Sequence, residues 1–191
     1  PGIDGHWYAN FGYYADDEPA SVPLEHHGFD QSVGSERRQA EYAVRWAAIG
    51  LAGGIQKIFY HAGTSQAMNA DNLEGVFYKY GGQPRRIYAA QAVLAHLLSP
   101  ATRFVRPLAL DDGVKAFLFR DGERLVAVVW AAGRAKPGAV RLADQRLQLR
   151  DIMGRTQAAR EFAPSDSPVY VVAQGVADDT FAKGIAARAN H

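Results

Sequence analysis

Apolar residues recur at helical spacing in two segments of the N-terminal half of the chain. The first segment begins near Ser35, a residue type favoured at helix N-caps, and stops at the pair Gly53-Gly54. Its apolar positions are Ala40, Ala43, Val44, Ala47, Ala48 and Leu51. The second segment begins near Pro84 and stops at Ser99-Pro100, and its apolar positions are Ile87, Ala90, Leu94, Leu97 and Leu98. The spacing predicts one helix in each segment.

A short apolar run, residues 55–60, lies between these two helices and is too brief for a helix of its own. Glycines precede it, so the pattern predicts a buried strand. The aromatic-rich residues 6–14 predict an earlier strand. Residues 6–98 would then alternate strand, helix, strand, helix, which is typical of parallel strands joined by helical crossovers.

The pattern changes after Pro100. Residues 114–119 and 125–130 are rich in β-formers, and Asp121-Gly122 between them is typical of a two-residue hairpin turn. We expect further strands at residues 102–108, 138–142, 146–151 and 167–172, and a short final helix at residues 178–189, which Gly184 weakens. Short strands separated by turns favour an antiparallel β-sandwich.

Two strand–helix units make a poor fold by themselves, because two parallel strands leave open edges and two helices cover too little of a sheet. The expected fold class is therefore α/β plus all-β. Residues 1–99 would form the seventh and eighth βα units of a (β/α)8 TIM-type barrel, and residues 100–191 a β-sandwich with a short C-terminal helix. The rest of the barrel would be supplied by a missing N-terminal region or a partner chain.

Composition and charge remove several classes of function. The 191 residues carry a formal charge of +1 with arginines scattered among acids, so we expect no nucleic-acid binding. The absence of cysteine excludes disulfides, zinc–thiolate sites and thiol nucleophiles. No apolar run approaches the roughly 20 residues that span a bilayer, so no membrane association is expected. The chain starts at Pro1 without a methionine and shows no signal peptide, so we do not expect Pro1 to be the start of the gene product. The compartment stays open, with secretion or a periplasmic location among the options.

Five segments occur in an order that resembles a known family. They are HWYANFGYYADDEP, SERRQAEYAVRW, KIFYHAGT, GVFYKYGGQPRRIYAA and DIMGR. This ordered set, spread over most of residues 7–172, resembles the C-terminal part of clan A glycoside hydrolases. Those enzymes have a (β/α)8 barrel followed by a β-sandwich. The resemblance implies a retaining hydrolase of poly- or oligosaccharides with a carbohydrate ligand and no cofactor.

At Asn10 the sequence departs from the motif of the family that it resembles. In such enzymes the nucleophilic glutamate ends the seventh strand, commonly within T-E-x-G-Y, and residues 9–13 here read ANFGY. An amide cannot replace the carboxylate that forms the glycosyl-enzyme intermediate. The family's acid/base glutamate ends the fourth strand, outside this chain, so these residues alone are not expected to be active. A shifted register, a non-catalytic relative and unreliable first residues are three open explanations, whereas Glu18 and Glu25 are better explained as solvated carboxylates.

Candidate substrate-binding residues lie where the two predicted barrel strands end. Tyr60 and His61 end the predicted eighth strand and could stack on a sugar ring and hydrogen-bond a hydroxyl, or simply serve the core. Trp7, Tyr13 and Tyr14 cluster beside Asn10 and could line a carbohydrate cleft or pack inside.

The remaining motifs indicate structure more than chemistry. His26-His27, with the acids around them, lack metal-ligand spacing, so no metal site is expected. No G-x-S-x-G elbow or phosphate-binding glycine loop occurs. Trp46 and Trp130 are expected to pack, and residues 151–154 (DIMG) to form a turn. The sequence leaves two hypotheses, a glycoside hydrolase portion and a non-catalytic carbohydrate-binding or scaffold relative.

Overall fold

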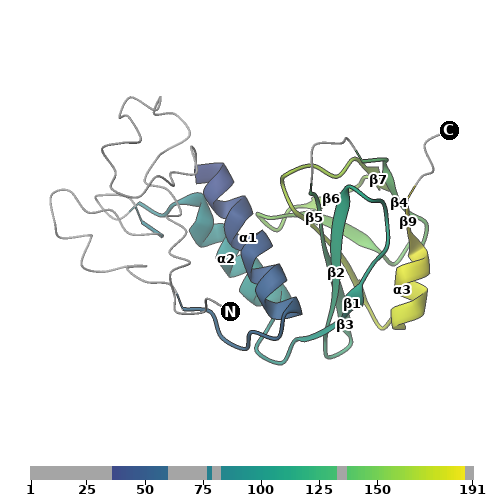
Figure 1. Ribbon diagram of the computed structural model, residues 1–191, viewed down its shortest axis with the longest axis horizontal. Helices are drawn as coiled ribbons and strands as arrows, with labels where there is room; N and C mark the ends of the chain where they lie inside the picture. The colour runs from purple at the N-terminus through teal and green to yellow at the C-terminus, as the bar shows by residue number, and fades with distance from the viewer. Residues whose placement is uncertain (1–35, 60–76, 79–82, 133–136, 188–191) are drawn as a thin grey trace, which may run out of the picture. The chain divides into compact units, whose positions relative to one another are not determined.

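The computed structural model describes residues 36–59, 77–78, 83–132 and 137–187 (Figure 1). They divide into two compact units. The first holds the described residues of Pro1–Ala43 and Lys57–Gln91, and the second those of Val44–Gln56 and Ala92–His191. Within these ranges no helix is long and apolar enough to cross a membrane.

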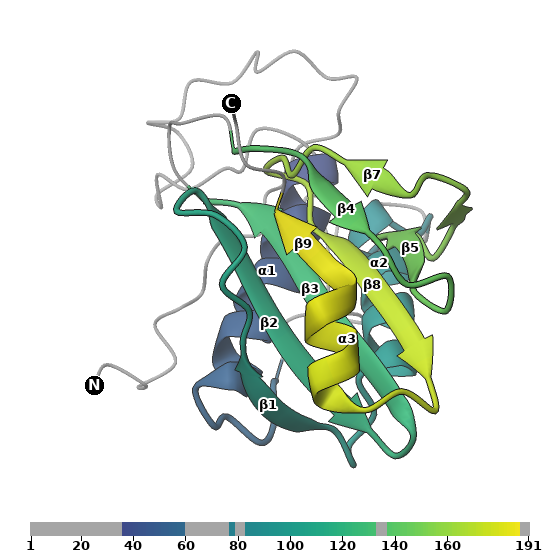
Figure 2. The same cartoon turned by 90° about the vertical axis from the view of Figure 1, so that its right-hand side faces the viewer.

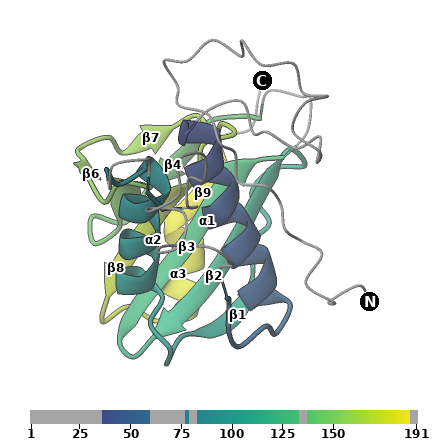
Figure 3. The same cartoon turned by 90° about the vertical axis from the view of Figure 1, so that its left-hand side faces the viewer.

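Both predicted helices of the N-terminal half are present, α1 at Glu36–Ala52 and α2 at Arg86–Leu97, and both can be followed in Figure 3. The predicted stripe of α1 is buried from Ala40 to Ala48, and all five predicted apolar positions of α2 and its end are buried. Helix α2 begins two residues after Pro84, because Pro84 forms an isolated antiparallel bridge with Tyr78. The backbone N–H of Arg85 donates to the Phe77 carbonyl at 2.8 Å.

The segment between the helices differs from its prediction. Residues 55–59 are assigned to no strand, and Phe59 is 84% exposed. A strand needs a hydrogen-bonding neighbour, and this segment has none among the described residues, so the apolar run by itself did not suffice. The predicted strand at residues 6–14 lies outside the described residues.

The larger sheet is antiparallel and has the order β1-β2-β3-β8-β5-β6. Its strands are β1 Arg103–Pro107, β2 Val114–Asp121, β3 Arg124–Ala131, β8 Val169–Gln174, β5 Gln148–Asp151 and β6 Thr156–Gln157. The predicted hairpin joins β2 to β3, with Asp121 paired to Arg124 and Gly122 at φ 60° in the turn. The antiparallel character predicted for this half is confirmed.

A smaller antiparallel sheet, β7-β4-β9, comprises β7 Glu161–Phe162, β4 Val140–Leu142 and β9 Ile185–Ala187. Helix α3, Asp178–Gly184, precedes β9. The prediction of one helix over residues 178–189 is therefore wrong for residues 185–187. Those residues pair with β4, and the Ala143 N–H donates to the Gly184 carbonyl at 2.8 Å, so sheet pairing replaces the last helical turn.

The strands of both sheets can be followed in Figure 2, and side chains from both sheets form one apolar core. Leu118, Leu125 and Val129 from the larger sheet pack with Leu142 and Ile185 from the smaller one. The opposite face of the larger sheet also carries buried side chains, namely Phe119, Val126, Val128, Trp130 and Tyr170. Because both faces are covered, β3 is apolar along almost its whole length. Trp130 packs as predicted, 3% exposed and with its ring centroid 5.5 Å from that of Phe117.

The turn predicted at residues 151–154 joins β5 to β6. Asp151 Oδ1 accepts the backbone N–H groups of Met153 and Arg155, each at 2.9 Å. Gly154 has φ 82°, a backbone conformation that favours glycine. This segment is a structural turn, as the sequence indicated.

Candidate functional site

The site residues singled out from the sequence, Asn10, Trp7, Tyr13, Tyr14, Tyr60 and His61, lie outside the described residues. So do His26 and His27. Among the described residues no group of three or more His, Asp or Glu side chains could hold a metal ion. The described chain offers two other places where polar or aromatic groups gather, one at the starts of α1 and α2 and one on the larger sheet.

A buried ion pair connects the starts of the two helices. Glu36, the first residue of α1, is 6% exposed, and Arg85, just before α2, is 2% exposed. Arg85 Nη1 lies 3.5 Å from Glu36 Oε1, and the backbone N–H of Arg86 lies 3.4 Å from Glu36 Oε2. The carboxylate thus faces the N-terminus of α2, where the helix dipole favours negative charge. The two helices begin side by side.

The first turns of α1 present further buried polar groups. Glu41 is 4% exposed and accepts a hydrogen bond from Arg37 Nε at 2.9 Å, and Gln39 is 1% exposed. Buried polar side chains are costly unless they are hydrogen-bonded; Glu41 is paired with Arg37, and Gln39 engages interactions of its own. The start of α1 is therefore built around polar contacts, whereas its middle is built from alanines.

Three aromatic rings gather beside the start of α2. The Tyr88 ring centroid lies 5.4 Å from that of Tyr78 and 6.5 Å from that of Phe77, and Tyr88 is 48% exposed. A hydrogen bond with the Tyr88 side chain, together with desolvation, raises the pKa of Tyr78. Such a cluster offers ring faces and hydroxyl groups at one surface, which suits contacts with a polar ligand that has apolar faces. We call Phe77, Tyr78 and Tyr88 the aromatic cluster.

Sequence analysis did not single out the aromatic cluster. Its one signal was Tyr88, which follows Ile87 and therefore falls off the apolar stripe of α2. An aromatic residue at an exposed helical position, near the pair Phe77-Tyr78, would have suggested a surface contact.

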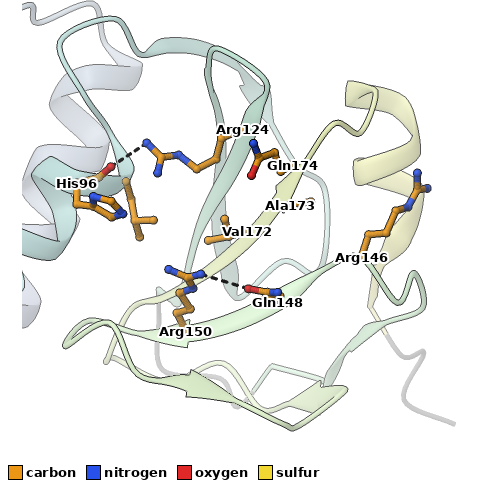
Figure 4. A pocket seen from close by; sticks show the side chains of 9 residues that line it. His96, Arg124, Arg146, Gln148, Arg150, Val172, Ala173 and Gln174 are labelled. Atoms are coloured by element: carbon orange, nitrogen blue, oxygen red, sulfur yellow. Dashed lines mark hydrogen bonds between the residues drawn. The ribbon is translucent and has the colours of Figure 1, made fainter.

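A pocket of about 510 Å³ opens on the larger sheet, at the C-terminal end of α2 (Figure 4). Its polar lining comes from α2, β3, β5, β8 and the residue two positions before β5. These side chains are His96, Arg124, Arg146, Gln148, Arg150 and Gln174. No acidic side chain lines it. We call it the arginine pocket.

Two of the three arginines are held by carboxylates. Arg124 Nη2 donates to Asp121 Oδ2 at 2.6 Å and to the His96 carbonyl at 2.8 Å. Arg146 forms two hydrogen bonds to Asp144, at 2.6 and 3.1 Å. These bonds lower the pKa of Asp144 to about 2, so this carboxylate stays charged in all but strongly acidic solution. Arg150 instead donates to the neutral Gln148 side chain at 3.2 Å.

Ser99 reinforces the anchoring of Arg124. The Ser99 hydroxyl donates to Asp121 Oδ1 at 2.8 Å. Desolvation raises the pKa of Asp121, but the hydrogen bonds from Arg124 and Ser99 together outweigh it and lower that pKa. The end of α2 is thereby tied to the β2–β3 hairpin.

A comparison with models of known protein families finds no match, and neither does a comparison with curated proteins.

Proposed function

We propose that the chain is the C-terminal portion of a glycoside hydrolase-like protein that acts on a poly- or oligosaccharide. Residues 1–99 contribute the last two βα units of a (β/α)8 barrel, and residues 100–191 a β-sandwich that braces it. The complete protein, if catalytic, uses two carboxyl groups in a retaining mechanism.

The contact of Glu36 with Arg85 and Arg86 carries this proposal. Helix α1 has 17 residues and extends about 26 Å at 1.5 Å per residue. The start of α2 lies beside the start of α1 and not beside its end. Neighbouring helices that start together, linked by a returning segment, are the arrangement of successive βα units.

The aromatic cluster supports a carbohydrate ligand. In βα barrels the active site lies at the C-terminal ends of the strands, which is also where the helices begin. Tyr78 and Tyr88 stand beside the start of α2, so they occupy that side of the unit. A sugar presents apolar ring faces to aromatic rings and hydroxyl groups to tyrosine oxygens. Tyr88 contacts the substrate in this proposal, as do the sequence-predicted residues Tyr60 and His61.

A second candidate function is a non-catalytic carbohydrate-binding or scaffold relative of these hydrolases. Asn10 favours it, because the residue that matches the family's nucleophile is a neutral amide. Such a protein keeps the aromatic contacts to sugar and lacks hydrolysis.

The test is an assay of the complete protein, native and with Asn10→Glu, against a panel of β- and α-linked polysaccharides. Hydrolysis by the native protein supports the enzyme and means that another residue is the nucleophile. Hydrolysis only after Asn10→Glu supports the non-catalytic relative. If neither form hydrolyses or binds any glycan, the proposed function is wrong.

Binding can be tested separately from hydrolysis. We expect Tyr88→Ala to weaken oligosaccharide binding to the complete protein about tenfold, as loss of one stacking ring does. Tyr42→Ala is the matched control, since Tyr42 is a 39% exposed tyrosine on α1. Equal effects of the two substitutions would show that the aromatic cluster does not contact the ligand.

A further inference from the structure

The arginine pocket is assembled by strand register. In the β3–β8 pair Arg124 lies opposite Gln174, and in the β5–β8 pair Gln148 lies opposite Val172. Residues two apart on a strand share a face, so Arg150 joins them. This face is the reverse of the one that carries the shared core, which holds Leu125, Leu149 and Ala173. Three neighbouring strands therefore present positive and amide groups to one pocket.

The charged side chains that line the pocket are all arginines, which are hydrogen-bond donors only. Arg124 reaches into it from one side and Arg150 from the other, with Val172 between them, while Arg146 stands further off (Figure 4). The Nε atoms of Arg124 and Arg150 are buried, and no acceptor among the described residues meets them. A buried N–H group needs an acceptor, and a guanidinium favours oxygen atoms that carry negative charge.

The charges of the pocket do not balance. Asp121 neutralises Arg124 and Asp144 neutralises Arg146, whereas Arg150 has no carboxylate partner within the described part of the chain. One positive charge in a partly enclosed space, surrounded by amide groups, attracts an anion. A volume of about 510 Å³ lies within the range for small-molecule sites, roughly 300–1,000 Å³, and exceeds the size of a bare ion.

We propose that the arginine pocket binds a small molecule through a carboxylate, sulfate or phosphate group. Arg150 supplies the uncompensated charge, Arg124 a second guanidinium held in place by Asp121, and Gln148 and Gln174 supply amide contacts. Planar guanidinium groups match such oxyanions with paired hydrogen bonds. This site does not depend on the proposed hydrolase function, because it is formed entirely by residues of the second unit.

The test is a titration of the full chain at fixed ionic strength, followed by NMR and calorimetry. The probes are inorganic phosphate, sulfate, glucuronate and, as a neutral comparison, glucose. We expect saturable binding of at least one anion, with shifts in the side-chain amide signals of Gln148 and Gln174. Tighter binding of glucuronate assigns the site to a carboxylate-bearing molecule, and tighter binding of phosphate or sulfate assigns it to those groups.

Amino-acid substitutions test whether the anion binds in the arginine pocket. Arg150→Gln should weaken binding about tenfold or more, because a charge-assisted hydrogen bond is lost. Arg141→Gln, an exposed arginine on β4, is the matched control and should leave binding unchanged. If Arg150→Gln does not fold, Gln148→Ala removes the group that orients Arg150 and should still weaken binding several-fold. Equal binding by the Arg150 and Arg141 variants, equal binding of glucose, or no saturable binding would overturn the proposal.

Discussion

The carboxylate of Glu36 and the guanidinium of Arg85 lie 3.5 Å apart although 49 residues separate them in the sequence. Both side chains are almost fully buried. The contact places the start of α2 beside the start of α1. The proposal of two successive βα units rests on this relationship.

Removing the Glu36 carboxylate should destabilise the protein. We expect Glu36→Gln to cost about 3–5 kcal/mol, because it removes the carboxylate that the buried Arg85 guanidinium contacts. Urea unfolding measures the change. Arg106→Gln is the control, since it breaks an exposed ion pair with Asp179 and should cost less than about 1 kcal/mol. Similar losses for the two variants would mean that the Glu36–Arg85 pair does not hold the helices.

Gly184 is required by packing and not by helix formation. A Cβ there would lie 2.9 Å from Leu147 Cδ1 and 3.0 Å from Asp144 Cβ. We expect Gly184→Ala to destabilise by about 1–3 kcal/mol from overpacking, although alanine is the better helix former by about 1 kcal/mol. Thermal unfolding compares it with Lys183→Ala at the exposed neighbouring position, which should change little. A gain in stability for Gly184→Ala would contradict the packing account.

Two glycines with left-handed backbone conformations allow the stability cost of backbone strain to be measured apart from the cost of steric crowding. Gly154 has φ 82° and Gly175 φ 65°, but a Cβ at residue 154 would meet Val93 Cγ2 at 3.0 Å while residue 175 has open space. Gly175→Ala should cost about 1–2 kcal/mol from backbone conformation alone, and Gly154→Ala should cost more. Adding Val93→Ala to Gly154→Ala should recover part of that excess in a double-mutant cycle. A cycle without coupling would show that Val93 does not press on the turn.

Asp121 should make stability depend on pH. The pKa of Asp121 is lowered in the folded protein. Its contribution to the free energy of unfolding is therefore complete above the unfolded-state pKa of about 3.9, and it is lost as the pH falls through the lower pKa of the folded state. We expect Asp121→Asn to be less stable than the native protein at pH 7 and to lose less stability between pH 5 and pH 2. Urea midpoints across this range measure the effect, with the exposed Asp166→Asn as control. An unchanged pH dependence in Asp121→Asn would assign the acid sensitivity to other carboxylates.

The elements with local patterns could be predicted from the sequence. The stripes from Ala40 and from Ile87 gave α1 and α2, and Asp121-Gly122 gave the β2–β3 hairpin, because each pattern is complete within a few turns or residues. Strands β6, β7 and β9 have two or three residues and exist only through their pairing with distant strands. No local pattern could indicate them.

The candidate sites were harder to predict for the same reason. Arg124 and Arg150 line the same pocket through the pairing of β8 with both β3 and β5, which brings together segments far apart in the chain. In the sequence these arginines were indistinguishable from a solvated surface. The first helix was predicted to begin near Ser35, and the structure shows that the Glu36 carboxylate faces the start of the next helix.

The coding sequence upstream of Pro1 tests the central proposal most directly. We expect about six further strand–helix units, with a glutamate at the end of the fourth strand as the acid/base residue. An upstream region without these units, or with them but without that glutamate, would contradict a hydrolase of this type.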